Sequence, residues 1–375
     1  DVIAYVDPKF KMPQVWRSNL NVDIQLPYDF MLSVGAMYTR DIYNVAQINM
    51  NEAEPTGVYN EQPDRIYWAS KKYEYNDYTN GKNVVVKLSN GEDKGYQYSF
   101  NAILTKKYDF GFTGSIGYTY TMAKDLTANP GSAPNSAWQN NVAVNSLNDP
   151  GVSYSLFSTP HRIIANASYE INYAKCLKTT FSLFYSGYHT GRYSYTYYND
   201  MNGDGNYSDL IYVPNSQDEM TFVDITDKSG AITYSAVDQA KDFWDFVNND
   251  SYLKDRKGKY VERNGSLTPW INRFDFKIAQ DFYATLGGRK YGIQVSLDML
   301  NVGNMINSKW GAYQSCGLKS YDNVQLLKTA SKVGEPLTYQ INANSREAFK
   351  ERSSWQYTNT IGSAWSMQLG VKVTF

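Results

Sequence analysis

The sequence predicts an all-β fold, a transmembrane antiparallel β-barrel to which this chain contributes nine strands, and three observations carry the prediction. Apolar and polar residues alternate with a period of two in nine segments. Short and long connections alternate between these segments, like the periplasmic turns and extracellular loops of outer-membrane barrels. Tyrosine is abundant, with 34 residues, and aromatic side chains gather where the predicted strands end, which is typical of two interfacial girdles.

The first two predicted strands form a hairpin. The apolar residues between 20 and 26 all fall on one side of an extended chain: Leu20, Val22, Ile24 and Leu26. The residues that alternate with them are polar: Asn19, Asn21, Asp23 and Gln25. After a tight turn at 27–29, the segment 30–39 alternates in the same way, so we expect the two segments to pair.

Three more hairpins and a last single strand follow the same pattern. The hairpins and their turns are 96–120 through Lys106–Lys107, 163–185 near Ala174–Lys175, and 274–299 through Gly287–Gly288. The ninth strand spans 365–375. The connections between hairpins are long: 51–94, 123–158, 199–268 and 307–360. Loops of this length argue against a compact soluble domain and favour the asymmetry of an outer-membrane barrel.

Composition excludes several classes of protein. No stretch approaches 18 consecutive apolar residues, which excludes a transmembrane helix but not barrel strands of about ten alternating residues. The formal net charge is -1 and there is no basic stretch, so we expect no nucleic-acid partner. Cys176 and Cys316 fit no metal spacing, and the predicted topology places them at opposite ends of the barrel as isolated thiols.

A soluble β-sandwich or propeller is the alternative for any single strand, because its strands alternate too. The nine segments taken together favour a sheet in a membrane. One face of the nine segments is almost free of charge, whereas the other carries Asn, Gln, Ser, Thr and paired charges. Barrel strands meet hydrocarbon tails on one side and a polar lumen on the other. The prediction fails if Val22, Phe276 and Leu369 lie buried together in a water-soluble core.

The last strand and several short motifs carry a resemblance to a known family. Residues 365–375 resemble the C-terminal targeting strand of bacterial outer-membrane proteins. Leu297-Asp-Met-Leu-Asn-Val-Gly-Asn304 is similar to the L-x-x-x-N-x-x-N segment that precedes the last loop of TonB-dependent transporters. Four motifs resemble the Oar-like receptors of Bacteroidetes: Thr159-Pro-His-Arg-Ile163, Asn202-Gly-Asp-Gly-Asn206, Asp209-Leu-Ile-Tyr-Val-Pro214 and Asn272-Arg-Phe-Asp-Phe276. The resemblance spans nearly the whole chain.

The family pattern implies a molecule larger than these 375 residues. It has a 22-stranded barrel, an N-terminal plug, and a TonB box that draws on the inner-membrane proton gradient. We therefore expect residues 1–375 to be the C-terminal part of the barrel, the last nine of 22 strands, without the plug and the N-terminal strands. Parity agrees, because a bacterial barrel has an even strand number and both termini in the periplasm. Residues 1–14 should then enter from an extracellular loop.

The resemblance implies active transport of an unidentified nutrient across the bacterial outer membrane, energised through TonB. This chain would form the barrel wall and the extracellular loops. The expected partners are outer-membrane lipid, the rest of its own barrel and plug, TonB through that plug, a surface lipoprotein and the unknown ligand. The alternative is a non-transporting outer-membrane scaffold or adhesin whose loops bind a partner protein. A plug and a TonB box upstream of Asp1 would favour transport.

One local motif predicts a calcium site in the loop at 200–209. The stretch from Asp200 to Ser208 matches positions one, three, five, six and nine of a calcium loop, but Ile211 stands where the bidentate glutamate belongs. If Asp209 substitutes, the ligands are four side chains and one carbonyl: Asp200, Asn202, Asp204 and Asp209, with the carbonyl of Asn206. Calcium would stiffen a long loop, and no cofactor is otherwise required. The alternative is a metal-free Asn/Gly turn.

The sequence predicts no enzyme and no catalytic residue. The only histidines, His161 and His189, point away from the lumen by strand parity, and there is no Gly-x-Ser-x-Gly elbow. The charged residues that face the lumen are interpreted as a network that bridges strands or grips a plug: Arg273, Asp275, Lys277, Asp298 and Lys372. The long loops are expected to contact substrate through aromatic and polar surface, at Tyr193, Tyr195, Tyr197 and Tyr198 and in the segment from Phe243 and Trp244 to Tyr260.

Overall fold

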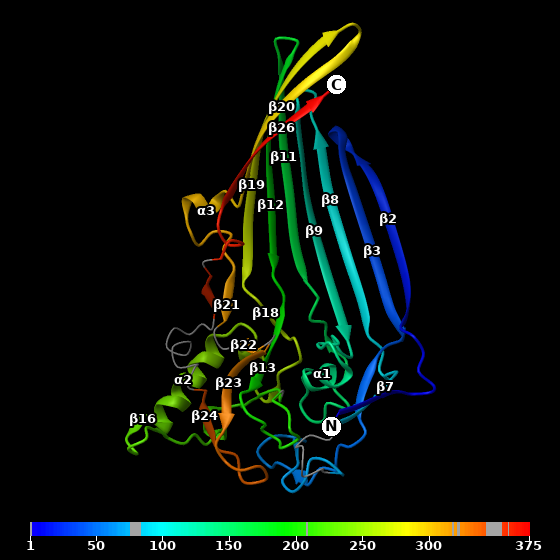
Figure 1. The fold of residues 1–375 in the computed structure, drawn as a ribbon. Coiled ribbons are helices and arrows are strands. Elements are labelled where there is room, and N and C mark those ends of the chain that lie inside the picture. The colour runs from blue at the N-terminus through cyan, green and yellow to red at the C-terminus, as the bar shows by residue number, and fades with distance from the viewer. Residues whose placement is uncertain are drawn as a thin grey trace.

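The computed structural model describes residues 2–75, 84–207, 209–316, 319–320, 323–342, 355–358 and 360–375. Strands account for 51% of the structure and helices for 10%, so the fold is mostly β, as predicted. Nine long strands stand side by side in one antiparallel sheet, and the long connections gather at one end of it (Figure 1). We call this gathered mass the loop body; it comprises β1 and the described parts of 44–95, 126–160, 190–269 and 314–358.

The long strands follow one another across the sheet in chain order. They are β2 (Gln14–Leu26), β3 (Phe30–Tyr43), β8 (Tyr96–Lys107), β9 (Phe112–Asp125), β11 (His161–Tyr173), β12 (Leu177–His189), β19 (Trp270–Leu286), β20 (Arg289–Leu300) and β26 (Ser366–Thr374). Val22 lies opposite Val34, which lies opposite Ala102, and the row continues through Tyr118 to Ile163. Opposite residues share a face of an antiparallel sheet. The period-two pattern therefore separates an apolar face from a polar face.

Short turns close all four hairpins, and three of them lie where the sequence predicts. Each of these three turns has two residues with positive φ, as tight turns between twisted strands often do: Tyr28 and Asp29, Ala174 and Lys175, and Gly287 and Gly288. The 3-10 turn η1 (Pro27–Asp29) is the first of them.

The turn of the second hairpin is displaced from the prediction at Lys106–Lys107, because both lysines belong to β8. The chain turns at 108–111, where the Gly111 N–H donates to the Tyr108 carbonyl at 3.1 Å. Gly111 has φ +96°, and a Cβ there would lie 2.3 Å from the Glu170 carbonyl oxygen. Only glycine combines this backbone conformation with so close an approach, so the turn forms around it.

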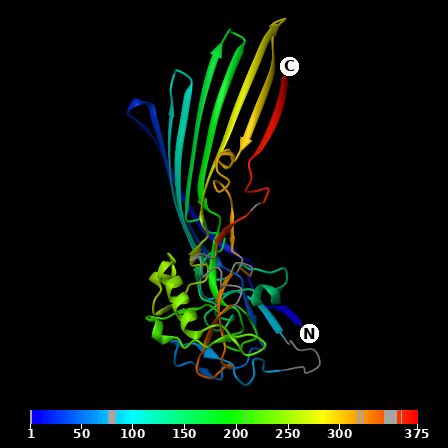
Figure 2. The same cartoon turned by 90° about the vertical axis from the view of Figure 1, so that its left-hand side faces the viewer.

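The two ends of the sheet differ. The short turns and the C-terminus lie at one end, and the loop body lies at the other (Figures 1 and 2). The first described strand, β1 (Val2–Val6), pairs with β7 (Val84–Ser89) inside the loop body, so the chain enters β2 from the loop end, as expected for residues 1–14. Asp1 lies outside the described residues. Cys176 lies beside a short turn and Cys316 lies in the loop body, so the two are at opposite ends and form no disulfide, as predicted.

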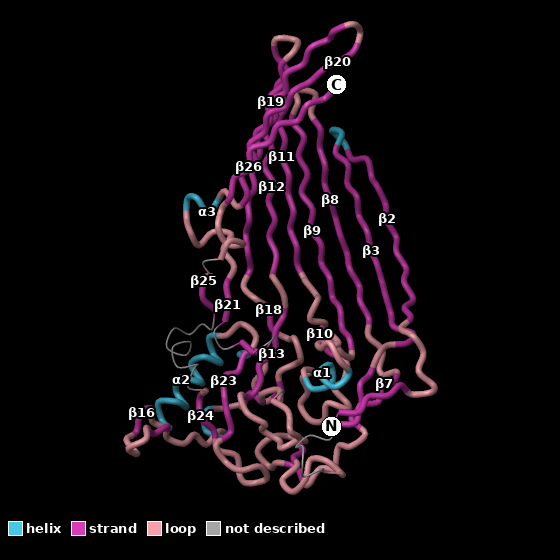
Figure 3. Tube along the Cα trace, in the orientation of Figure 1, coloured by secondary structure: helices cyan, strands magenta, loops and turns pink. Residues whose placement is uncertain are grey.

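The loop body consists of short strands, short helices and irregular segments (Figure 3). Its remaining strands are β4 (Ala46–Asn49), β5 (Gly57–Val58), β6 (Ile66–Tyr67), β10 (Ser153–Tyr154), β13 (Arg192–Tyr197), β14 (Tyr212–Val213), β15 (Ile225–Thr226), β16 (Ile232–Tyr234), β17 (Lys259–Tyr260), β18 (Ser266–Leu267), β21 (Gln314–Cys316), β22 (Lys319–Ser320), β23 (Asn323–Thr329), β24 (Tyr339–Ile341) and β25 (Trp355–Tyr357). Its helices are α1 (Pro134–Gln139), α2 (Ala236–Asn249), η2 (Gln217–Glu219) and η3 (Leu253–Asp255), whereas α3 (Gly303–Ile306) lies beside the long strands. Strands β18, β13, β23 and β22 form its main sheet, and β24 pairs with β23.

The hydrophobic core lies in the loop body. Both clusters of buried apolar side chains lie outside the nine long strands. The larger cluster packs α2 against β13 and β23 through fully buried residues such as Phe243, Tyr195 and Leu326. The smaller one surrounds Trp138 and Val84. Apolar burial therefore stabilises the loop body, whereas the ladder of backbone hydrogen bonds holds the long strands together.

The apolar face of the long strands is exposed. Leu20 is 68% exposed and Leu369 is 72% exposed, and none of Val22, Phe276 and Leu369 is buried. A β-sandwich would bury this face against a second sheet. No second sheet among the described residues covers it.

Among the described residues, no helix combines the length and apolar character needed to cross a membrane. Within the same part of the chain, β2 pairs only with β3 and β26 only with β20, so the sheet is open at both edges.

Equivalent truncations in the two regions should have different effects on stability. Leu326→Ala removes a fully buried side chain of the loop body, and we expect it to lower the free energy of unfolding by about 2–5 kcal/mol. Leu369→Ala, on the exposed face, should lower it by less than about 1 kcal/mol in detergent. Denaturant unfolding of both variants tests this. Equal losses of unfolding free energy in the two variants would show that the hydrophobic core does not lie in the loop body.

Candidate functional site

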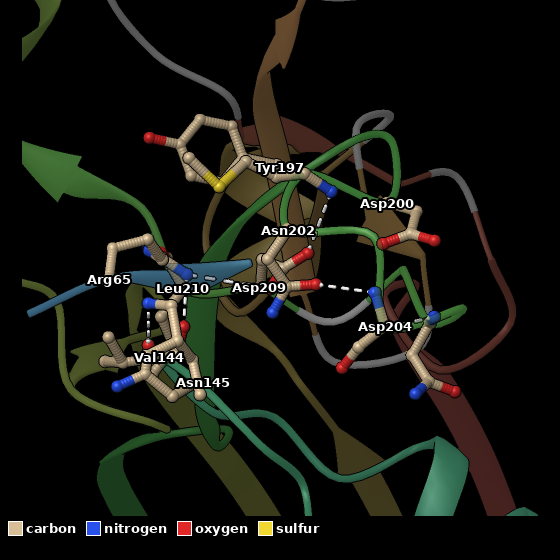
Figure 4. Close-up of polar contacts among 12 residues, drawn as sticks. Arg65, Val144, Asn145, Tyr197, Asp200, Asn202, Asp204, Asp209 and Leu210 are labelled. Atoms are coloured by element: carbon tan, nitrogen blue, oxygen red, sulfur yellow. Dashed lines mark hydrogen bonds and ion pairs between the residues drawn. The ribbon is translucent and has the colours of Figure 1, made fainter. Parts of the chain in front are cut away.

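The predicted calcium loop lies in the loop body, directly after β13, and folds around its own side chains (Figure 4). The Asp200 carboxylate accepts from the Gly203 N–H at 2.7 Å and from the Gly205 N–H at 2.9 Å. Both glycines have positive φ. A Cβ at Gly203 would lie 2.5 Å from the Trp68 carbonyl oxygen, so the Asn-Gly-Asp-Gly spacing is needed for the tight path of the chain.

The middle of the loop is held by the same kind of hydrogen bond, from a backbone N–H to a side-chain oxygen. Asn202 Oδ1 accepts from the Asp204 N–H at 3.0 Å, and Asp204 Oδ1 accepts from the Asn206 N–H at 2.7 Å. Short polar side chains that bond to the backbone two residues on are typical of Asx turns. Asn202, Asp204 and Asn206 are all buried. The polar residues of the motif therefore satisfy the backbone of a loop that is folded into the protein interior.

Asp209 closes the loop and joins it to a distant arginine. Its Oδ2 accepts from the Met201 N–H at 3.0 Å, and its Oδ1 lies 3.6 Å from Arg65 Nη1. Neither side chain of the ion pair is more than 3% exposed. The Arg65 guanidinium also donates to the carbonyls of Val144 and Leu210, and it lies over the Tyr260 ring at 4.8 Å. Arg65 thus ties together four segments of the loop body.

The three carboxyl groups of the loop are in an environment that disfavours their ionised forms. Burial is the main cause, and it raises the pKa of Asp200 and Asp204 above the ordinary value. It raises the pKa of Asp209 to about 7, against the opposing effect of Arg65. Repulsion from Asp209 and Asp200 further raises the pKa of Asp204, and repulsion from Asp200 further raises the pKa of Asp209. The loop therefore concentrates negative charge, which a cation or a proton would neutralise.

The structure brings the predicted ligands Asp200, Asn202, Asp204 and Asp209 to one loop, in which Asn206 also lies (Figure 4). Five side-chain oxygens of Asp200, Asn202, Asp204 and Asp209 already accept hydrogen bonds from backbone N–H groups. In the described part of the chain, no group of three or more His, Cys, Asp or Glu side chains has the arrangement of a metal site. Calcium binding thus stays a prediction, and the metal-free Asn/Gly turn accounts for the hydrogen bonds.

Sequence reasoning missed Arg65, which contacts the loop from a distant part of the chain. An arginine in a polar segment gives no signal of its own. The buried carboxylate of Asp209 needs a partner, but nothing in a single sequence shows which arginine provides it.

Four of the aromatic residues predicted to contact substrate have a different role. Tyr193, Tyr195, Tyr197 and Phe243 are at most 3% exposed and belong to the core of the loop body, so the prediction is wrong for them. Tyrosine hydroxyl groups find partners inside the core. The Tyr195 hydroxyl donates to the Asp250 carboxylate at 2.8 Å, and its oxygen lies 3.1 Å from the Tyr193 hydroxyl oxygen. Burial raises the pKa of Tyr193 to about 12. Tyr198, in contrast, is exposed.

Four of the five charged residues predicted to face the lumen form two ion pairs. Lys277 and Asp298 bridge β19 and β20 at 2.8 Å, and Arg273 pairs with Asp275 at 3.5 Å. The two histidines join aromatic neighbours: His161 Nδ1 lies 2.6 Å from the Tyr118 oxygen, and the His189 ring packs edge-on against Trp270. The pair Lys277–Asp298 therefore bridges two neighbouring strands, as expected, whereas Arg273 and Asp275 pair within β19.

Comparison of the chain with family models, with curated proteins and with solved structures gave no match in any of the three. The resemblance of the short motifs to TonB-dependent transporters thus stays a prediction.

The stability of the loop body should depend on the protonation of Asp209. Its pKa is raised from 3.8 to about 7 in the folded state, so folding favours the protonated form. The stabilisation is complete below about pH 4 and is lost as the pH rises through 7. We expect the free energy of unfolding, from denaturant titration, to fall by roughly 2–3 kcal/mol between pH 5 and pH 8. Asp209→Asn should lessen this slope, to which the raised pKa values of Asp200 and Asp204 also contribute, and the exposed Asp218→Asn should keep it unchanged; equal slopes in both would argue against Asp209.

Calcium should oppose the same destabilisation if the loop binds it. At pH 8, 1 mM calcium would then raise the free energy of unfolding by about 1 kcal/mol, the gain expected for a loop of extracellular affinity. Magnesium at the same concentration is the control ion, and Asp204→Asn is the variant that should lose the response. Calorimetry that detects no calcium uptake by the folded protein would leave the metal-free turn.

Proposed function

We propose that the nine long strands are part of the wall of an outer-membrane β-barrel, and that the protein imports a nutrient as a TonB-dependent transporter. The observation that carries the proposal is the exposed apolar face: Leu369, Val371 and Val373 are each at least 60% exposed on β26 alone. Soluble proteins rarely expose continuous apolar surfaces of this extent. Hydrocarbon tails are a solvent in which such a face is stable.

Three further features support the barrel. The strands follow chain order as an antiparallel meander, the connections at one end are short, and those at the other are long. The open edges β2 and β26 leave room for further strands of the same wall. In the proposed orientation the short turns face the periplasm, and the loop body lies outside the cell, where its packed core lets it act as a cap over the lumen.

The orientation of the apolar face can be tested on β26. Leu369→Arg places a charge on the apolar face, and we expect it to lower the free energy of unfolding in lipid vesicles by about 2–4 kcal/mol. Gln368→Arg, one residue earlier, places the charge on the polar face opposite Asp298 and should cost less than about 1 kcal/mol. A soluble protein would tolerate both. Equal, small effects would therefore contradict the membrane setting.

The transport proposal needs a separate experiment in the cell. We expect the depletion of at least one solute from the growth medium to stop both in a strain without this protein and in a strain without TonB. The control strain carries Gln368→Arg, which leaves the wall intact. If every solute is depleted normally and a surface protein is instead lost from the deletion strain, the protein is a scaffold or adhesin.

A further inference from the structure

A groove of about 810 Å³ lies on the apolar face, at the side of the sheet nearest to β26. Its floor consists of outward side chains of β11, β12 and β19, among them Ala165, Leu183 and Phe274. Its far wall is the segment that follows α3, with Trp310, and β25 contributes Tyr357. The volume is that of a small-molecule site. The small Ala165 leaves the floor open between larger neighbours.

The two asparagines of the L-x-x-x-N-x-x-N motif hold the wall of this groove in place. Asn301 Nδ2 donates to the Gly311 carbonyl at 3.2 Å and to the Ser363 carbonyl at 2.9 Å. Asn304 Nδ2 donates to the Ser308 carbonyl at 2.7 Å and to the Trp310 carbonyl at 3.1 Å. The segment that carries Lys309 and Trp310 is thus fixed by side-chain clamps on both of its sides.

Three polar groups in the floor of the groove pair with one another. Asn272 Oδ1 accepts from the Tyr185 hydroxyl at 2.8 Å and from the Trp270 Nε1–H at 3.0 Å. The surface that remains for a ligand is therefore mainly apolar. A sugar or a peptide would lose water from its polar groups here without gaining hydrogen bonds in return. An acyl chain has no such groups.

One cation stands at the rim. Lys309 is exposed, and its ammonium lies 5.8 Å from the centre of the Tyr357 ring. Among the described residues, no carboxylate lies within ion-pair distance of it. A lysine in this position attracts a phosphate as a point charge. The apolar floor matches an acyl chain, and the Lys309 ammonium at the aromatic rim matches a phosphate. The groove thus has the parts needed to bind a phosphorylated lipid.

A second groove on the same face provides a comparison. It measures about 500 Å³ and is lined by β2, β3 and β8 residues, which include Leu20, Ala36 and Phe100 but no charged side chain. Both grooves face the surface that the proposed function assigns to lipid. Only the groove at Lys309 joins an apolar floor to a cation.

We propose that the groove at Lys309 binds a membrane phospholipid whose headgroup carries a net negative charge, with an acyl chain against Ala165, Leu183 and Phe274 and the phosphate at Lys309. The lipid belongs to the leaflet nearest to the loop body, because the groove lies toward the loop end of β11 and β19, where Trp270 begins β19. This inference rests on the proposed membrane function, and it adds a preferred lipid to a wall that would otherwise contact lipids without selection.

The experiment uses the full-length protein in vesicles of equal phosphatidylcholine and phosphatidylglycerol, which differ in net headgroup charge. After gentle extraction, native mass spectrometry counts the lipids that stay bound. We expect retained phosphatidylglycerol to exceed phosphatidylcholine. Lys309→Gln should lower the retained phosphatidylglycerol about fivefold, the effect of one lysine at a membrane surface. Ala165→Phe, which fills the floor, should remove both lipids.

Matched variants separate the groove from general effects. Lys241→Gln removes an exposed lysine of α2, and Ala36→Phe fills the second groove, so both should retain the lipids at the level of the unchanged protein. Addition of inorganic phosphate should not displace the lipid, because phosphate lacks the acyl chain. Thermal unfolding of each variant shows whether it is folded.

The outcomes distinguish the two proposals. If the protein enters vesicles but retains both lipids equally, or if Lys309→Gln changes nothing, the lipid site is refuted and the membrane function stands. Displacement by inorganic phosphate alone would reduce the site to an anion site and also refute the lipid proposal. If the folded protein does not enter vesicles at all, both proposals fail.

Discussion

The exposed apolar face of the nine long strands is the constraint on which the rest of the structure depends. Hydrogen bonds between neighbouring strands satisfy the backbone of the sheet, but one row of side chains after another faces away from any protein core. In water such a surface is unfavourable, whereas in hydrocarbon it is not. In the proposed membrane setting, the same constraint also accounts for the position of the loop body. Irregular backbone is stable only where water or other protein groups satisfy it, so the long connections collect beyond the end of the strands and form their own core.

The sequence predicted the sheet well because period two is a local property. Alternation placed Val22 and Leu369 on one face without any knowledge of their neighbours, and the pairing within each hairpin followed from its short turn. The loop body was not predicted in this way. Tyr193, Tyr195 and Tyr197 alternate with polar residues as strand residues do, yet both sides of β13 are buried, so aromatic residues expected at a binding surface became core. Burial of that kind depends on segments that are distant in sequence.

The loop at 200–209 shows the same limit at a finer scale. Its glycines and Asx side chains follow from the spacing of the motif, because each polar group bonds to a backbone N–H a few residues away. The ion pair of Asp209 with Arg65 does not follow, since it joins segments that only the tertiary structure brings together. A buried loop with three carboxyl groups disfavours their ionised forms, so its balance is sensitive to protons and cations. The site and its electrostatics therefore became visible only once the fold was known.

The open edges of the sheet have a practical consequence. Along β2 and β26, backbone groups point outward in a regular ladder with no strand of the described chain to meet them. Detergent covers side chains, but it forms no hydrogen bonds with amides, so it leaves these ladders able to pair with another copy. Natural sheets guard such edges with charges, prolines or bulges. The apolar alternation of β26 provides little of this protection, so copies of the isolated polypeptide are prone to self-associate edge to edge into extended ribbons.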